Sequence, residues 1–248
     1  MDAPLKIAIV GASGGIGAAL LDLLADRDDV ASIHASYFKS PAGSSLGSVG
    51  NFGNSTEIIW SELDASDDAS VQAWMASVGQ IDWLINCVGM LHTQTQGPEK
   101  SIKHLDAEHF AMSMSVNCLP TMLLAKYASA ALKGSQNGIF ATVSARVGSI
   151  EDNKLGGWYS YRASKAALNM VLKCLSIEWQ RTLKNVRVLS LHPGTTDSRL
   201  SKPFQNNVPE GSLFSPEKTA TLLLAQLDSA KSHPSGRFIA YDGQEIPW

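Results

Sequence analysis

Residues 6–17 read KIAIVGASGGIG, a short apolar run that ends directly in a cluster of glycines. The run is typical of a buried parallel strand, and residues 18–25 continue at helical spacing. A glycine turn between a strand and a helix places unpaired backbone N–H groups at the positive end of the helix dipole, where an anion binds. Gly11 allows the tight turn, Gly15 the close approach of a pyrophosphate, and Gly17 close packing of helix on strand. The stretch therefore predicts a dinucleotide-binding unit.

Strand-like and helical segments alternate along the whole sequence, with no break in composition and no internal repeat. This alternation predicts one α/β domain over residues 1–248, built as a Rossmann-type, doubly wound parallel sheet with helices on both faces. A single long helix is expected over residues 106–132. Residues 199–214 show little periodicity, and a long segment of this kind inside a compact domain is expected to be a lid over the substrate. The runs expected as strands are 6–10, 32–38, 57–63, 81–88, 138–144, 186–191 and 236–241.

The composition narrows the class of protein. The 248 residues are 44% hydrophobic with a net charge of −3, which suits a large core and argues against a nucleic-acid or membrane partner. Three widely spaced cysteines and an N-terminus without a signal-peptide pattern indicate reduced thiols and a cytoplasmic location. The His, Cys and carboxylate residues show no metal-ligand spacing, so no metal site is expected.

The stretch from Tyr161 to Lys165 carries the expected chemistry. Two residues four apart lie on the same face of a helix. A cation beside a phenol favours the phenolate, which predicts a lowered pKa for Tyr161 and a role as general acid or base. A chance pairing of Tyr and Lys is the alternative. Tyr159 has alanine four residues later, so it is expected to pack or to form part of the pocket wall rather than react.

The glycine spacing G-x-x-x-G-x-G with the downstream Y-x-x-x-K resembles the short-chain dehydrogenases/reductases, and the resemblance covers nearly the whole chain. Residues 156–165, GGWYSYRASK, and residues 202–209, KPFQNNVP, are similar to the C-factor and sniffer-type carbonyl reductase branch. The resemblance implies hydride transfer between NADP(H) and a carbonyl or alcohol substrate, with Tyr161 as general acid/base. It also implies a homodimer or homotetramer that pairs through the helices around Asn117 and Lys165.

The resemblance further implies catalytic roles for Ser144, Asn117 and Lys165. The serine would hold the substrate oxygen, the asparagine a water, and the lysine the nicotinamide ribose. The family pattern S-x-x-G places Ala145 in the serine position, so this chain departs from it. We predict that Ser144 serves instead, with Ser149 as the alternative.

Cofactor contacts are predicted at the glycine turn and at the ends of later strands. The end of the second expected strand carries no acid for a ribose 2′-OH, whereas Lys39 and Ser40 could accept a 2′-phosphate, so NADP is favoured and NAD stays possible. Lys39 could also be only a solvated loop charge. Asp64 could cap a helix, and Asn86 could stabilise the sheet rather than touch the ligand. The predicted cofactor residues, besides Tyr161 and Lys165, are Gly11, Ser13, Gly15, Ile16, Gly17, Lys39, Asp64, Asn86, Gly89, Pro193, Gly194, Thr196 and Ser198.

A second function belongs to another class. Proteins that resemble C-factor are associated with cell-contact signalling, so the chain could bind a nucleotide with little or no turnover. The missing serine of the S-x-x-G pattern slightly favours this alternative.

Overall fold

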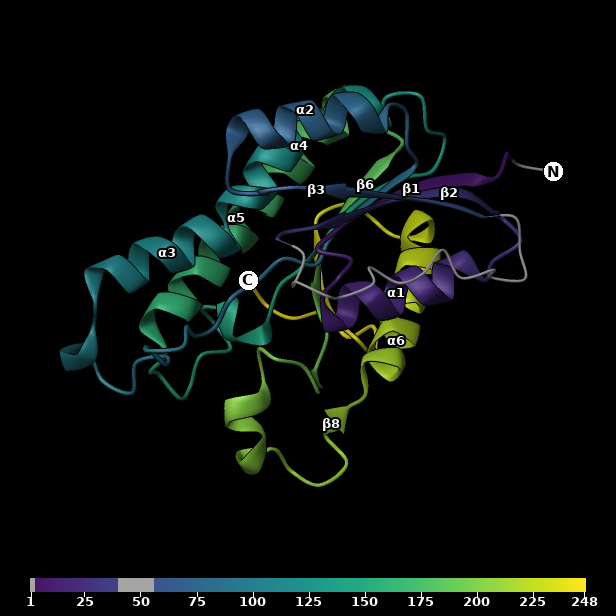
Figure 1. Ribbon diagram of the computed structural model, residues 1–248. Coiled ribbons are helices and arrows are strands. Elements are labelled where there is room, and N and C mark those ends of the chain that lie inside the picture. Colours follow the sequence, from purple (N-terminus) through teal and green to yellow (C-terminus); the bar gives the residue numbers. More distant parts are fainter. Residues whose placement is uncertain (1–2, 40–55) are drawn as a thin grey trace.

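The computed structural model describes residues 3–39 and 56–248 and contains a seven-stranded sheet (Figure 1). The strand order is β3-β2-β1-β4-β5-β6-β9, and every neighbouring pair runs parallel. This order confirms the predicted doubly wound sheet. The strands are β1 (Leu5–Val10), β2 (Val30–Tyr37), β3 (Glu57–Glu62), β4 (Trp83–Asn86), β5 (Gly138–Val143), β6 (Val186–His192) and β9 (Arg237–Ala240).

Helices cover both faces of the sheet, as predicted (Figure 1). Side chains alternate along β1, so Ile7 and Ile9 pack with α1 and α6 on one face, and Ala8 packs with α2, α4 and α5 on the other. The helices are α1 (Gly15–Ala25), α2 (Asp68–Val78), α3 (Ala107–Asn117), α4 (Leu119–Leu132), α5 (Tyr159–Thr182) and α6 (Pro216–Ser229). Within the described residues, no helix has the length and apolarity that crossing a membrane requires.

The prediction of one helix over residues 106–132 is wrong. The chain forms two helices, because α3 ends at Asn117 and α4 begins at Leu119. Pro120 has no N–H to continue the hydrogen bonds of a preceding helix, but it is tolerated in the first turn of a new one. The break places Asn117 at the end of α3, where its side chain reaches the segment that follows β4.

The short elements lie mainly around the carboxyl ends of the strands. From β1, the strands β2 and β3 are added on one side of the sheet, and the strands from β4 onward are added on the other side. Open α/β sheets bind ligands at such a switch point, outside the carboxyl ends of the strands. The glycine turn follows β1 there. The remaining elements are the pair β7 (Thr195–Thr196) and β8 (Leu213–Phe214), and the 3₁₀ turns η1 (Ile102–His104), η2 (Arg146–Gly148), η3 (Lys202–Asn207) and η4 (Ala230–Ser232).

Candidate active site

The glycine turn has the close geometry that its sequence predicts. Gly11 has φ 79°, which favours glycine. A Cβ on Gly17 would lie 2.3 Å from the carbonyl oxygen of Gly11, so only glycine fits there. Gly14 precedes α1 and offers no side-chain cap, which leaves the first N–H groups of the helix available to an anion. The turn therefore fits a pyrophosphate; Ser13 and Gly15 are exposed in it, and Ile16 is half-buried.

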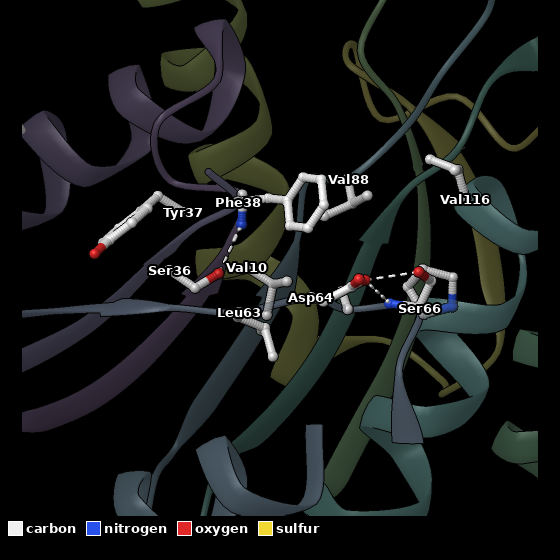
Figure 2. Close-up of a pocket in the computed structure, with 12 residues that line it drawn as sticks. Val10, Ser36, Tyr37, Phe38, Leu63, Asp64, Ser66, Val88 and Val116 are labelled. Carbon is white, nitrogen blue, oxygen red and sulfur yellow. Dashed lines mark hydrogen bonds between the residues drawn. The ribbon is translucent and has the colours of Figure 1, made fainter. Parts of the chain in front are cut away.

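A cavity of about 230 Å³ lies beside this turn, between the ends of β1, β2 and β4 (Figure 2). Gly11, Asp64 and Val88 are among its lining residues. The Asp64 carboxylate accepts hydrogen bonds from the backbone N–H and hydroxyl of Ser66, at 2.9 and 2.6 Å. The cavity is mostly apolar with a fixed carboxylate at one side, which suits a flat base attached to a ribose.

The end of β2 forms one wall of the cavity through Tyr37 and Phe38. Lys39 follows with φ 49°, a left-handed conformation that is uncommon for a residue with a side chain. Its side chain is exposed, and its Nζ lies 5.0 Å from the centre of the Phe38 ring. Lys39 is therefore free to approach a phosphate at the mouth of the cavity. Ser40, the other residue predicted to bind a 2′-phosphate, lies outside the described residues.

Tyr161 and Lys165 come together in the first turns of α5. Both side chains are buried, with 7% and 2% exposed. Lys165 Nζ lies 5.9 Å from the centre of the Tyr161 ring and donates a 3.1 Å hydrogen bond to the carbonyl of Val143. A Cβ on Gly89 would lie 3.5 Å from both Lys165 Nζ and Asn117 Oδ1. The structure thus gathers four predicted site residues at the ends of β4, β5 and α3.

The predicted lowering of the Tyr161 pKa is wrong for the chain by itself. Burial raises the pKa of Tyr161 above its ordinary value, because the charged phenolate loses its hydration. The ammonium of Lys165 faces the ring and bonds to Val143, so it does not offset this loss. Among the described residues, the buried side-chain polar atoms that lack a hydrogen-bond partner are Trp74 Nε1, His109 Nδ1 and Asn169 Nδ2. The Tyr161 hydroxyl is not one of them.

Burial also perturbs Lys165 and gives a pH-dependent stability. Burial lowers the pKa of Lys165 from 10.5 to about 8. Between these values the unfolded chain binds more protons than the folded chain, so the free energy of unfolding should rise with pH, by at most about 1.4 kcal/mol per pH unit. We expect Lys165→Met to remove this rise. Urea unfolding of both proteins without cofactor, at pH 7, 8, 9 and 9.5, measures it; equal pH slopes for the two would contradict the prediction.

The two predicted asparagines tie the end of β4 to its neighbours. Asn117 accepts from the N–H of Met90 at 2.7 Å, and donates to the Met90 carbonyl at 2.8 Å and to Ser164 Oγ at 3.0 Å. Asn86 donates to Thr121 Oγ1 at 3.0 Å, and its Oδ1 accepts from the N–H two residues on. These bonds tie the end of β4 to α3, α4 and α5, while the predicted water and cofactor contacts of the two amides stay predictions.

Each candidate serine hydroxyl makes a hydrogen bond within the protein. Ser144 donates a 2.8 Å hydrogen bond to Asn169 Oδ1, which also accepts from Ser190. Asn169 lies eight residues beyond Tyr161 on α5, roughly 12 Å along the helix. Ser149 accepts from the backbone N–H of the residue three positions later, at 3.0 Å. Both serines are buried, and their predicted contact with a substrate stays a prediction.

The segment after β6 approaches the glycine turn from the other side. Gly194 has φ 74°, and the Thr196 hydroxyl shares a 2.8 Å hydrogen bond with Thr219 of α6. The Cβ of Ser198 lies 3.5 Å from where a Cβ on Gly15 would be. The segment from Pro193 to Ser198 therefore leads from the carboxyl end of β6 to the glycine turn, and the predicted cofactor contacts of Pro193, Gly194, Thr196 and Ser198 stay predictions.

The sequence-based prediction of the site did not include a row of three aromatic residues of which the first, Trp158, lies beside Tyr161. The Trp158 ring lies 6.3 Å from the Tyr161 ring and 5.4 Å from Phe204 in η3, and Phe204 lies 5.9 Å from His92. His92 also bonds the carbonyl of Arg199, at 3.3 Å. The predicted lid is thus anchored on the aromatic residue that precedes α5. The feature of the sequence that could have indicated this aromatic contact is the position of Trp158, three residues before Tyr161.

Comparisons with known proteins agree with this architecture. A model of the short chain dehydrogenase family matches residues 6–209. The 1-hydroxy-2-glutathionyl-2-methyl-3-butene dehydrogenase of Rhodococcus sp. (strain AD45) is 31% identical, over 98% of this chain and 99% of that protein. C-signal of Myxococcus xanthus is 33% identical, over 68% of this chain and 94% of that protein.

A solved structure has the same fold. The NADPH-bound carbonyl reductase from chicken fatty liver superposes with a TM-score of 0.83 at 21% identity, over 100% of this chain and 96% of that one. At this identity the likeness concerns the fold, whereas the family match covers most of the sequence. The chain therefore belongs to the short-chain dehydrogenase family.

Proposed function

We propose that the chain is an NADPH-dependent carbonyl reductase in which Tyr161 is the proton donor. The observation that carries this proposal is the placement of Tyr161 and Lys165 at the carboxyl end of the sheet, beside Gly89 and Asn117. NADPH, when bound, supplies the hydride that adds to the carbonyl carbon. The NADPH-bound carbonyl reductase with the same fold supports this choice of cofactor and reaction.

The raised pKa of Tyr161 favours reduction over oxidation. At neutral pH the phenol keeps its proton, because burial disfavours the phenolate. An alkoxide that forms from the carbonyl is a far stronger base than a phenolate, so the proton moves from the Tyr161 hydroxyl to the substrate oxygen. Oxidation needs the reverse transfer, for which a phenol with a raised pKa is a poor starting state.

The remaining contacts follow from where the residues lie. We propose that the first N–H groups of α1, from Gly15 on, bind the pyrophosphate and that Asp64 faces the adenosine. Lys165 would hold the nicotinamide ribose, since its Nζ lies at the Gly89 backbone. Ser198 and Thr196 would close on the nicotinamide end from the segment after β6.

Lys39 gives a test of cofactor choice. The exposed ammonium at the end of β2 would attract a 2′-phosphate but gains nothing from a free 2′-OH. We expect Lys39→Ala to weaken NADPH binding by about 5- to 30-fold, equivalent to about 1–2 kcal/mol for one exposed charge-assisted bond, and to leave NADH binding unchanged. Fluorescence titration with both cofactors measures this. Equal losses for NADPH and NADH would assign Lys39 a role other than 2′-phosphate recognition.

A panel of aldehydes, ketones and quinones tests the proposed reaction. We expect NADPH oxidation, followed at 340 nm, with at least one class. The alternative is a nucleotide-binding signalling protein, which the similarity to C-signal and the occupied hydroxyl of Ser144 favour. NADPH binding without turnover on every member of the panel would support that alternative and contradict the reductase.

Pairing of two or more copies through the helices around Asn117 and Lys165, which are α3, α4 and α5 in the structure, stays a prediction. Met122 on α4, and Met170 and Ile177 on α5, have 49%, 62% and 50% of their surfaces exposed. Apolar side chains on these helices are compatible with a second copy covering them, which light scattering would detect.

A further inference from the structure

The residue that caps the Tyr161 helix lies far away in the sequence. Helix α5 begins after Trp158, whose side chain cannot accept a hydrogen bond from the first turn. The buried carboxylate of Glu99, in the segment between β4 and η1, takes this place. Its Oε2 accepts from the N–H of Ser160 at 3.1 Å, and its Oε1 accepts a very short hydrogen bond from the Ser160 hydroxyl. Glu99 is 2% exposed and Ser160 is fully buried.

The main chain of Glu99 holds the residue before the helix as well. Its carbonyl accepts from the N–H of Trp158 at 2.5 Å. Trp158 has φ 51°, and it follows Gly156 and Gly157, which have φ 65° and 68°. A left-handed residue with a bulky side chain is strained and persists only where its surroundings hold it. Glu99 thus fixes both the strained turn and the first turn of the helix that carries Tyr161.

A carboxylate suits this position on electrostatic grounds. The N-terminus of a helix carries a partial positive charge, so an anion is stabilised there. Burial alone would raise the pKa of Glu99. Hydrogen bonds, chiefly those from Ser160, outweigh this effect together with the electrostatic attraction of the nearby His109, so the pKa lies below its ordinary value. His109, on α3, is itself buried. The acid is therefore ionised and enclosed at neutral pH.

We infer that Glu99 is a positioning residue for the reaction, one that sets the placement of the Tyr161 hydroxyl by fixing Trp158 and Ser160 on either side of the start of α5. This inference rests on the proposed role of Tyr161 as proton donor. A small displacement of a reacting group can lower the rate a hundredfold. Loss of the Glu99 hydrogen bonds to Ser160, the residue next to Tyr161, should therefore lower turnover before it weakens cofactor binding.

The test replaces the carboxylate by a group of the same shape. In Glu99→Gln one acceptor oxygen becomes an NH₂ donor, so the negative charge at the helix N-terminus is lost and the Ser160 hydroxyl can keep its contact only by turning round to accept. We expect kcat to fall at least tenfold, with the KM and Kd for NADPH within twofold of wild type. Ser160→Ala removes the hydroxyl contact alone and should lower kcat in the same direction by less, which keeps the inference testable should Glu99→Gln fail to fold.

Asp67→Ala is the matched control. Asp67 caps helix α2 by accepting a 2.7 Å hydrogen bond from the N–H of Ser70. Helix α2 carries no reacting group. We expect this variant to lower the melting temperature and to leave kcat within twofold of wild type. A Glu99→Gln protein with a wild-type kcat, or one that loses only melting temperature, overturns the inference. A wild-type protein without turnover on the carbonyl panel contradicts the proposed function instead.

Discussion

Tyr161→Phe is expected to lower kcat for carbonyl reduction by about 10²- to 10⁴-fold, the range that a positioned general acid contributes. The substitution removes one oxygen and leaves the ring in its contact with Trp158. Binding of NADPH should stay within about threefold of wild type, because the ring and Lys165 remain in place. Stopped-flow measurement of NADPH oxidation at saturating substrate gives the rate, and fluorescence titration gives the binding constant.

Tyr159→Phe is the control for this experiment. Tyr159 stands on the same helix two residues earlier, is 39% exposed, and has no lysine four residues later. It should keep its full turnover. Equal turnover of Tyr161→Phe and wild type would exclude Tyr161 as the proton donor.

Gly17→Ala is expected to weaken NADPH binding by about a hundredfold or more. The new Cβ would stand 2.3 Å from the carbonyl oxygen of Gly11 and 3.1 Å from Cα of Ala12, all of them backbone atoms that cannot rotate away. The turn has to move by about 1 Å to relieve the contact, and a displacement of that size misplaces the N–H groups that would bind the pyrophosphate. Titration of the folded variant with NADPH measures the loss.

Gly97→Ala is the matched glycine substitution. A Cβ at Gly97 meets no atom within 4 Å, and its φ is not in the left-handed region. NADPH binding should be unchanged. Should Gly17→Ala bind NADPH as tightly as Gly97→Ala does, the cofactor does not lie on the glycine turn.

The sheet could be predicted from the sequence because each strand is a short apolar run bounded by glycine or polar residues. The run 57–63 corresponds to β3, and 186–191 to β6, each within one residue. The prediction of one helix over 106–132 is wrong because the helix hydrogen bonds do not continue through Pro120. The buried residues of α3 are His109, Ser113 and Asn117, so no apolar pattern marks where the first helix ends.

The site was less accessible to prediction, because its key contacts join distant parts of the chain. Glu99 and Ser160 are 61 residues apart, and no local pattern links them. The hydrogen bond from Ser144 to Asn169 likewise depends on which strand lies beside α5. The pKa of Tyr161 was predicted in the wrong direction because helical spacing places Lys165 near the phenol but says nothing of burial.

The most direct test of the account is a crystal structure of the protein with bound NADP⁺. We predict the pyrophosphate on the turn formed by residues 13–17, the adenosine in the cavity beside Asp64, and the nicotinamide with its C4 carbon facing the Tyr161 hydroxyl. A nicotinamide bound elsewhere, or a Tyr161 hydroxyl that points away from C4, would contradict the assignment of Tyr161 as the proton donor.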